Sequence, residues 1–130
     1  MDEWSRNISD IMEEMRTRSF FDFRDSGSWQ PATNVYESSD AYYICVDLAG
    51  VREEAVELRN VNANQIRVVG RRRQPRPHGV DWPLSVHLME IDQGPFSREI
   101  DFPDPVDFEA RRVISDEGFL WITLPKKAKP

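Results

Sequence analysis

The feature that most constrains the fold is an alternating run near the end of the chain, residues 119–124, with the sequence FLWITL. Its leucine and isoleucine residues occupy every second position, which is the period of a β-strand. The positions between them include two large aromatic residues, Phe119 and Trp121. A strand that is apolar on both sides needs cover on both sides. We therefore expect one face of it in a core and the other beneath a partner segment.

The same alternation of apolar residues recurs upstream and predicts a domain built from β-strands alone. Short alternating runs are separated by turn-forming residues, and no helical pattern interrupts them. About seven or eight short strands at this spacing predict a two-sheet antiparallel sandwich. Within the second of these runs, Cys45 lies on the face opposite its apolar neighbours, which favours a structural thiol over a nucleophile. The predicted strands cover residues 33–37, 41–48, 55–60, 65–70, 84–91 and 119–124, with two more between 94 and 116.

Residues 1–28 differ in kind from the rest of the chain. Their first apolar residues have the spacing of one helical face, and an aromatic cluster and the linker-like sequence DSGS follow. One interpretation is a short helix that packs on the domain. The other is an apolar arm that contacts partners, a role for which methionine and aromatic side chains are well suited. The residues concerned are Trp4, Ile8, Ile11, Met12, Met15, Phe20, Phe21 and Phe23.

Length and composition restrict the class of protein. A chain of 130 residues is long enough for one domain, and its net charge of −6 argues against general nucleic-acid binding. It contains no apolar run approaching the roughly 20 residues of a membrane helix, and no basic-then-apolar signal peptide at its start. Cys45 is the single cysteine, so a reducing compartment is expected. These features predict a cytoplasmic protein that binds neither nucleic acid nor membranes.

The sequence offers little support for catalysis. Motifs for a nucleophile elbow or a phosphate-binding loop are absent, and His78 and His87 do not have metal-site spacing with Cys45. We therefore expect no enzyme, no catalytic residue, no metal and no cofactor. One basic cluster, residues 71–73 with Arg76, is interpreted as a strand end where charge discourages edge pairing. Phosphate binding is the weaker alternative for that cluster.

An ordered set of motifs carries a resemblance to a known family. The run GPFSREIDFP begins at Gly94, Ala110 follows seven residues after its last proline, and GFLWITLPK ends at Lys126. Upstream are WQP at Trp29, NVYE shortly after it, and DLAGV beginning at Asp47. Together these resemble the α-crystallin domain of small heat shock proteins over residues 29–126. The resemblance implies an immunoglobulin-like β-sandwich preceded by a short N-terminal helical arm at 1–28 and followed by a short tail at 127–130.

The family resemblance also implies a function. Small heat shock proteins are ATP-independent holdases that bind partly unfolded proteins and prevent their aggregation, and their N-terminal arm usually holds the clients. In bacterial and plant members, a strand in the loop corresponding to about 72–93 pairs with the neighbouring subunit. We accordingly expect a homodimer by strand exchange, with a larger homo-oligomer as an alternative. The residues expected at the dimer interface are His87, Met89, Glu90 and Arg98.

Members of the family carry a groove that receives an I-x-I or I-x-V motif from another subunit's tail. The resemblance places it between a strand like residues 55–60 and the final strand, with Val56, Leu58, Phe119 and Trp121 as its candidate residues. Because Val56 and Leu58 alternate inward, core packing is the alternative role for them. The segment after the final strand, PKKAKP, lacks such a motif. The alternative function is a CS-domain-like co-chaperone that binds one specific folded partner.

Overall fold

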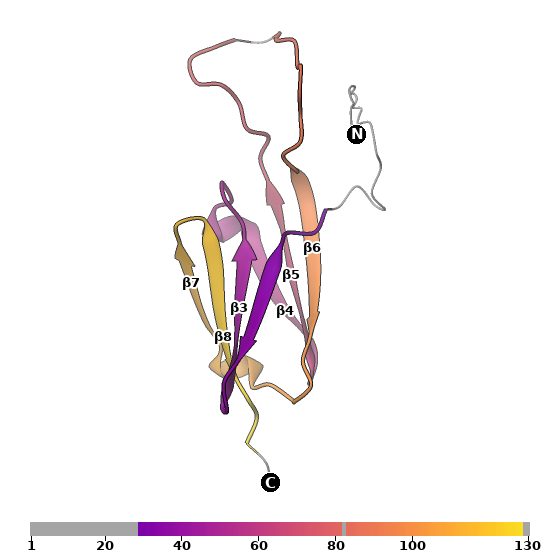
Figure 1. Ribbon diagram of the computed structural model, residues 1–130, viewed down its shortest axis with the longest axis vertical. Helices are drawn as coiled ribbons and strands as arrows, with labels where there is room; N and C mark the ends of the chain where they lie inside the picture. Colours follow the sequence, from indigo (N-terminus) through magenta and orange to yellow (C-terminus); the bar gives the residue numbers. More distant parts are fainter. Residues whose placement is uncertain (1–28, 82, 129–130) are drawn as a thin grey trace. The chain divides into compact units, whose positions relative to one another are not determined.

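The computed structural model describes residues 29–81 and 83–128 (Figure 1). The chain divides into two compact units, the first comprising residues 1–29 and 74–94 and the second comprising residues 30–73 and 95–130. The predicted arm and its apolar residues, Trp4 to Phe23, lie outside the described residues.

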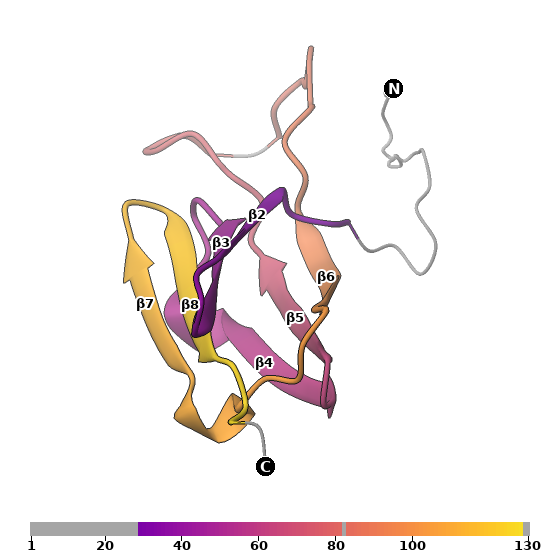
Figure 2. The same cartoon turned by 60° about the horizontal axis from the view of Figure 1, so that its bottom comes forward.

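The second unit is the predicted β-sandwich, made of two antiparallel sheets (Figure 2). The four-stranded sheet has the order β2-β3-β8-β7, and the three-stranded sheet has the order β4-β5-β6. Two 3₁₀ turns, η2 (Glu53–Ala55) and η3 (Phe108–Ala110), precede β4 and β7. The strands are β2 (Thr33–Glu37), β3 (Ala41–Asp47), β4 (Val56–Asn62), β5 (Gln65–Arg72), β6 (Gly94–Asp101), β7 (Arg112–Asp116) and β8 (Phe119–Pro125).

The core lies between the two sheets, and it is filled by the positions that alternate inward. In the four-stranded sheet, Ile44 of β3 pairs with Ile122 of β8, and both side chains are fully buried. In the three-stranded sheet, Ile66 and Val68 of β5 are buried in the same way. Burial of such side chains is the main stabilising term of a domain of this size, at about 1.5–3 kcal/mol each. The alternation seen in the sequence therefore gives the correct inner face for both sheets.

Gly70 in β5 marks a point of close packing in the three-stranded sheet. A Cβ atom at this position would lie far inside van der Waals distance of the Ala55 carbonyl oxygen and of the Phe96 ring. The backbone of β5 and the ring from β6 can approach this closely because glycine has no side chain. Phe96 is buried as a result.

The connection between β7 and β8 is a two-residue hairpin turn. Its residues Glu117 and Gly118 both have positive φ, 52° and 85°. Positive φ at both central positions is characteristic of a type I′ turn, whose twist matches that of the two strands it joins. The Asp-Glu-Gly turn expected from the sequence is present, with Asp116 as the last residue of β7.

The first unit contains the long connection between β5 and β6. Among the described residues 74–81 and 83–93 of the single chain the structure assigns no strand, so the strand expected at 84–91, which was to pair with a second subunit, stays a prediction. A strand requires a neighbour to pair its N–H and C=O groups, and the described part of this unit provides none. One long-range contact within the unit is a hydrogen bond from the Trp29 indole N–H to the Gly94 carbonyl oxygen, at 3.2 Å.

Candidate functional site

The outer face of the four-stranded sheet carries a row of exposed apolar side chains, here called the aromatic strip. It consists of Tyr36, Ile114, Phe119 and Trp121, which are 50%, 63%, 42% and 36% exposed. The strand register brings them together: Trp121 of β8 lies opposite Cys45 of β3 on one side and opposite Ile114 of β7 on the other. Single exposed apolar residues are ordinary on a protein surface, but adjacent ones on neighbouring strands indicate an interaction surface.

Two rings of the strip meet across β3. Tyr36 and Trp121 stack with their centroids 6.3 Å apart and their planes 25° from parallel. Asn34 donates a hydrogen bond from its side-chain amide to the Tyr36 hydroxyl at 3.1 Å. Cys45 lies at an outward position of β3, the strand between β2 and β8. It is nevertheless only 8% exposed, because the stacked rings of the two flanking strands lie above it. The strip is therefore a packed surface rather than a set of isolated side chains.

Burial also determines the chemistry of the Cys45 thiol. Desolvation raises the pKa of this thiol above its usual value, and the negative charge of Asp47 raises it further. A raised pKa disfavours the thiolate, which is the reactive form of cysteine. This agrees with the interpretation of Cys45 as a structural residue on the outward face of β3.

Acidic side chains border one end of the aromatic strip. Phe119 pairs with Asp47 on β3 and with Asp116 on β7, so both carboxylates lie beside it on the same face. Within residues 29–81 and 83–128, neither carboxylate forms an ion pair. Arg112 occupies the opposite end of β7, next to Thr123. The outer face consequently has an acidic end near Phe119 and a basic end near Thr123.

The outer face of the three-stranded sheet has a different character. Arg67 of β5 forms an ion pair and hydrogen bonds with Glu99 of β6. Gln65 donates to Asp101 at 2.7 Å in the same pair of strands. On β4, Arg59 lies 3.2 Å from Glu57. The charges on this face are largely paired with one another.

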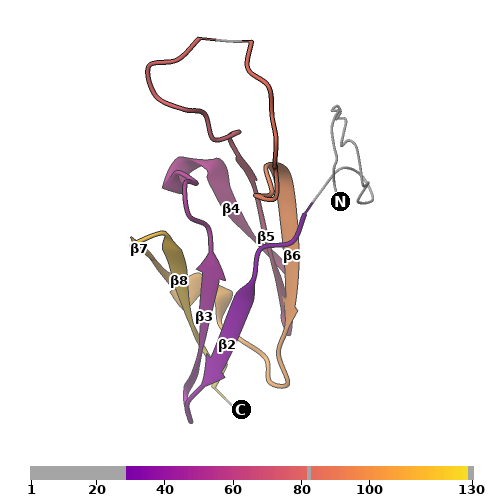
Figure 3. The ribbon, with the colours of Figure 1, turned by 45° about the horizontal axis from the view of Figure 1, so that its top comes forward.

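The four predicted groove residues lie on two different surfaces. Phe119 and Trp121 belong to the outer face, whereas Val56 and Leu58 are half-buried at alternate positions of β4. The final strand β8 also lies between β3 and β7, so it has no free edge. The edge strands are β2 and β7 in one sheet and β4 and β6 in the other. Figure 3 shows β2 at one margin of its sheet, with β3 between it and β8.

The connection between β5 and β6 exposes a second set of apolar side chains. Leu84, Val86 and Leu88 alternate along it, and Leu88 is the most exposed at 76%. The predicted interface residues His87 and Glu90 are exposed as well. Met89 is half-buried, and its sulfur accepts a long hydrogen bond of 3.8 Å from the Gln93 side chain.

Arg98, the remaining predicted interface residue, lies on β6 and is half-buried. Its Nη1 donates to the carbonyl oxygen of Pro31 at 3.5 Å, which is long for a hydrogen bond. This guanidinium therefore faces the segment that leads into β2, and the weak bond leaves much of its donor capacity for another acceptor.

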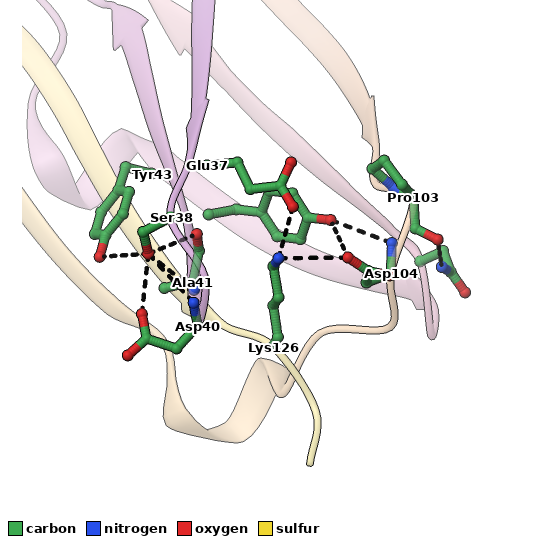
Figure 4. A network of polar contacts seen from close by, with 10 residues as sticks. Glu37, Ser38, Asp40, Ala41, Tyr43, Pro103, Asp104 and Lys126 are labelled. Carbon is green, nitrogen blue, oxygen red and sulfur yellow. Dashed lines mark hydrogen bonds and ion pairs between the residues drawn. The ribbon is translucent and has the colours of Figure 1, made fainter. Parts of the chain in front are cut away.

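A polar network fixes the end of β8 (Figure 4). The Lys126 amine lies 2.6 Å from a Glu37 carboxylate oxygen and 3.5 Å from an Asp104 carboxylate oxygen. The Tyr42 hydroxyl donates to Asp104 at 3.0 Å. The hydrogen bond to Glu37 raises the pKa of Lys126, and desolvation raises the pKa of Tyr42. The network joins β2, β3, the end of β8 and the segment after β6. Its polar groups form ion pairs and hydrogen bonds with one another.

Other kinds of site find no support in the described part of the chain. No cluster of three or more histidine, cysteine or acidic side chains there is arranged to hold a metal ion. Among the same residues, no helix is long and apolar enough to cross a membrane.

Sequence reasoning missed several residues of the outer face, namely Tyr36, Ile114, Asp47 and Asp116. The signal for Ile114 was present, because residues 112–116 alternate and Ile114 falls in the same row as Arg112 and Asp116. Tyr36 could not be placed without the pairing of β2 with β3, which sets it beside Tyr43.

Comparison with known proteins relates the chain to a family. Residues 34–130 match the Hsp20/alpha crystallin family. The chain is 30% identical to the 17.7 kDa class II heat shock protein of Arabidopsis thaliana over 97 residues, covering 75% of this chain and 61% of that protein. It is also 30% identical to small heat shock protein C4 of Rickettsia felis over 100 residues, covering 75% of this chain and 57% of the relative. The chain thus spans about three fifths of the length of these relatives.

A solved structure of a heat shock protein has a similar fold. Heat shock protein 16.0 from Schizosaccharomyces pombe superposes with a TM-score of 0.65 at 25% identity, covering 79% of this chain and 96% of that one. The motifs, the two-sheet topology and the match over three quarters of the chain agree with one another. The protein belongs to the Hsp20/alpha crystallin family.

Proposed function

We propose that this protein is an ATP-independent holdase, a chaperone that binds partly unfolded proteins and keeps them from aggregating. The observation that carries the proposal is exposed apolar surface in both units: the aromatic strip in the sandwich and the alternating residues 84–88 in the long connection. Clustered exposed apolar side chains promote aggregation unless they bind a partner, so they indicate an interaction surface. A chaperone of this class acts by mass action, because it binds the aggregation-prone state of its client without chemical change.

The proposal includes a homodimer formed by strand exchange. Residues 84–91 have strand-like alternation, but the described chain gives them no strand partner. An edge strand of a second copy would supply backbone hydrogen-bond partners for residues 84–91, and β2 is one such edge strand. His87, Met89 and Glu90 would then lie at the interface. Arg98 is proposed to join them, since its present hydrogen bond to Pro31 is long.

The arm, residues 1–28, is proposed to bind clients through its aromatic and methionine side chains. Val56 and Leu58 of β4, with Phe119 and Trp121 on the outer face, are proposed as additional contacts. The role requires no cofactor, nucleotide or catalytic group. A cytoplasmic location is proposed because Cys45 is a free, buried thiol.

The test is suppression of light scattering by a heat-labile enzyme at several chaperone ratios, with and without ATP. We expect full-length protein to suppress aggregation equally in both conditions, and deletion of residues 1–28 to abolish most of the effect. Circular dichroism of the truncated protein serves as the control that the sandwich is still folded. Failure of the full-length protein to suppress aggregation would contradict the proposed function.

The native mass of the same samples tests the dimer. We expect a mass of at least two chains that persists on dilution, and we expect Leu88→Asp to shift it toward one chain by burying a charge in the proposed interface. Val61→Asp on β4 is the matched control, because Val61 is also exposed but lies outside the proposed interface. A mass of one chain for the unaltered protein at all concentrations would rule out strand exchange.

A further inference from the structure

The aromatic strip combines three properties that together specify a ligand: flat exposed rings, a buried floor and an acidic end. We propose that the strip binds extended, partly unfolded segments in which aromatic side chains lie close in sequence to lysine or arginine. The inference rests on the proposed chaperone function and adds to it the place of contact and the chemistry of the preferred client.

The stacked pair Tyr36 and Trp121 provides the apolar part of the site. Aromatic rings offer large contact areas with few rotatable bonds, and they prefer to pack against other rings. Their stacking already covers Cys45, which is why this thiol is only 8% exposed. The surface is consequently formed before any ligand arrives, and binding does not need to order it first.

The dimensions of the strip suit a short extended segment. Ile114, Trp121 and Tyr36 lie on β7, β8 and β2, and β3 separates the last two. Three strand spacings amount to about 14 Å, which is the length of about four residues in an extended chain. In a segment lying obliquely across the strands, every second side chain would face the strip, near Ile114, Trp121 and Tyr36 in turn.

The charged side chains lie on the two sides of this path, at opposite ends of β7 and β8. Asp47 and Asp116 lie on either side of Phe119, and neither has an ion-pair partner in the described chain. Arg112 lies at the far end of β7 beside Thr123. A basic residue next to the bound aromatic side chain would pair with the two carboxylates, whereas an acidic residue there would be repelled. The overall charge of −6 reinforces the preference for basic clients.

Fluorescence anisotropy with the full-length chain and three labelled eight-residue peptides tests the inference. The first peptide contains two phenylalanines followed by two arginines, the second has glutamates in place of the arginines, and the third has serines in place of the phenylalanines. We expect the first peptide to bind about tenfold more tightly than either of the others, since paired anchors dominate such contacts. Equal affinity for the arginine and glutamate peptides would overturn the inference.

Variants locate the binding on the strip. Asp47→Asn combined with Asp116→Asn is expected to reduce the preference for the arginine peptide about fivefold, as the loss of an attractive charge pair implies. Ile114→Ser, at a side chain 63% exposed, is expected to weaken the binding of that peptide. Val61→Ser on β4 is the matched control, because Val61 is 41% exposed and lies on the other sheet. A loss with Val61→Ser as large as that with Ile114→Ser would overturn the assignment.

Further outcomes distinguish a second copy of the chain on the strip from a client segment, and failure of this inference from failure of the proposed function. If NMR signals of Ile114 and Trp121 change on dilution without peptide, a second copy of the chain covers the strip and the inference is wrong. If the full-length protein suppresses aggregation but binds no peptide at the strip, this inference fails while the proposed function stands. If it suppresses no aggregation, the proposed function fails, and peptide binding is then judged by the affinities alone.

Discussion

The two outer faces of the sandwich are built on the same architecture but have opposite surface chemistry. On the three-stranded sheet, Arg67 pairs with Glu99 and Gln65 bonds Asp101, so the polar groups satisfy one another across neighbouring strands. On the four-stranded sheet, the corresponding outward positions hold Trp121 and Ile114, which remain exposed. A face whose charges are already paired gains little free energy by binding a partner. Exposed rings gain free energy when a partner removes their apolar area from water.

This contrast shows where the molecule can accept partners without losing its fold. The inner face of each sheet is already filled by buried side chains, and the charged outer face is occupied by its own pairs. The aromatic strip and the exposed residues 84–88 are two described surfaces where exposed apolar side chains gather. The proposed holdase activity is therefore expected to depend on these surfaces, and variants there are expected to change it without changing stability.

The largest expected effect comes from the inner face of the strand that carries the strip. Ile122 is fully buried, whereas its neighbour Trp121 is 36% exposed. We expect Ile122→Ala to lower the free energy of unfolding by about 2–5 kcal/mol, because it leaves a cavity in the core. Urea unfolding measures this difference. A loss below that of Ile114→Ala would contradict the division of β8 and β7 into inner and outer rows.

An intermediate effect is expected from giving the charged face the character of the strip. The double variant Arg67→Leu and Glu99→Leu removes the cross-strand ion pair and adds two apolar side chains to the outer face. We expect it to increase the fluorescence of a dye that binds apolar surface, by about twofold, in proportion to the apolar area exposed. The unaltered protein is the reference, and unchanged fluorescence would show that apolar area alone does not make a binding face.

The smallest effect is expected from breaking that ion pair without adding apolar surface. Glu99→Gln keeps the shape of the side chain and removes its charge. Both partners are partly exposed, at 35% and 47% for their side chains, so solvent screens their attraction. We expect a change in unfolding free energy of less than about 1 kcal/mol, measured by urea unfolding. A larger loss would mean that the pair contributes to the sheet beyond its surface position.

Much of this fold could be predicted from local patterns in the sequence. The strand Thr33–Glu37 has the predicted bounds, and β8 differs from its prediction by one residue. These predictions succeed because alternation reports which side of a strand is buried. The family resemblance supplied the expectation of an α-crystallin fold, and the match of residues 34–130 confirms it.

The parts that could not be predicted depend on long-range pairing. Alternation identifies the two faces of β8, but it does not reveal that β8 lies between β3 and β7. The family resemblance grouped Val56 with Trp121, whereas the structure places them on strands of different sheets. The strand expected at 84–91 is not formed within the single chain, since alternation indicates a preference that still needs a neighbouring strand.

The turn at Glu117 and Gly118 has a consequence for how the surface of the protein is specified during folding. β7 and β8 are adjacent in sequence, so their hairpin can form early, whereas β3 and β8 must meet across more than seventy residues. A slip of one residue in that hairpin would turn Phe119 and Trp121 inward and Leu120 and Ile122 outward. The positive φ angles at Glu117 and Gly118 fix a two-residue loop and hence the register. Two backbone angles thus decide which of two alternating rows the folded protein presents to the solvent.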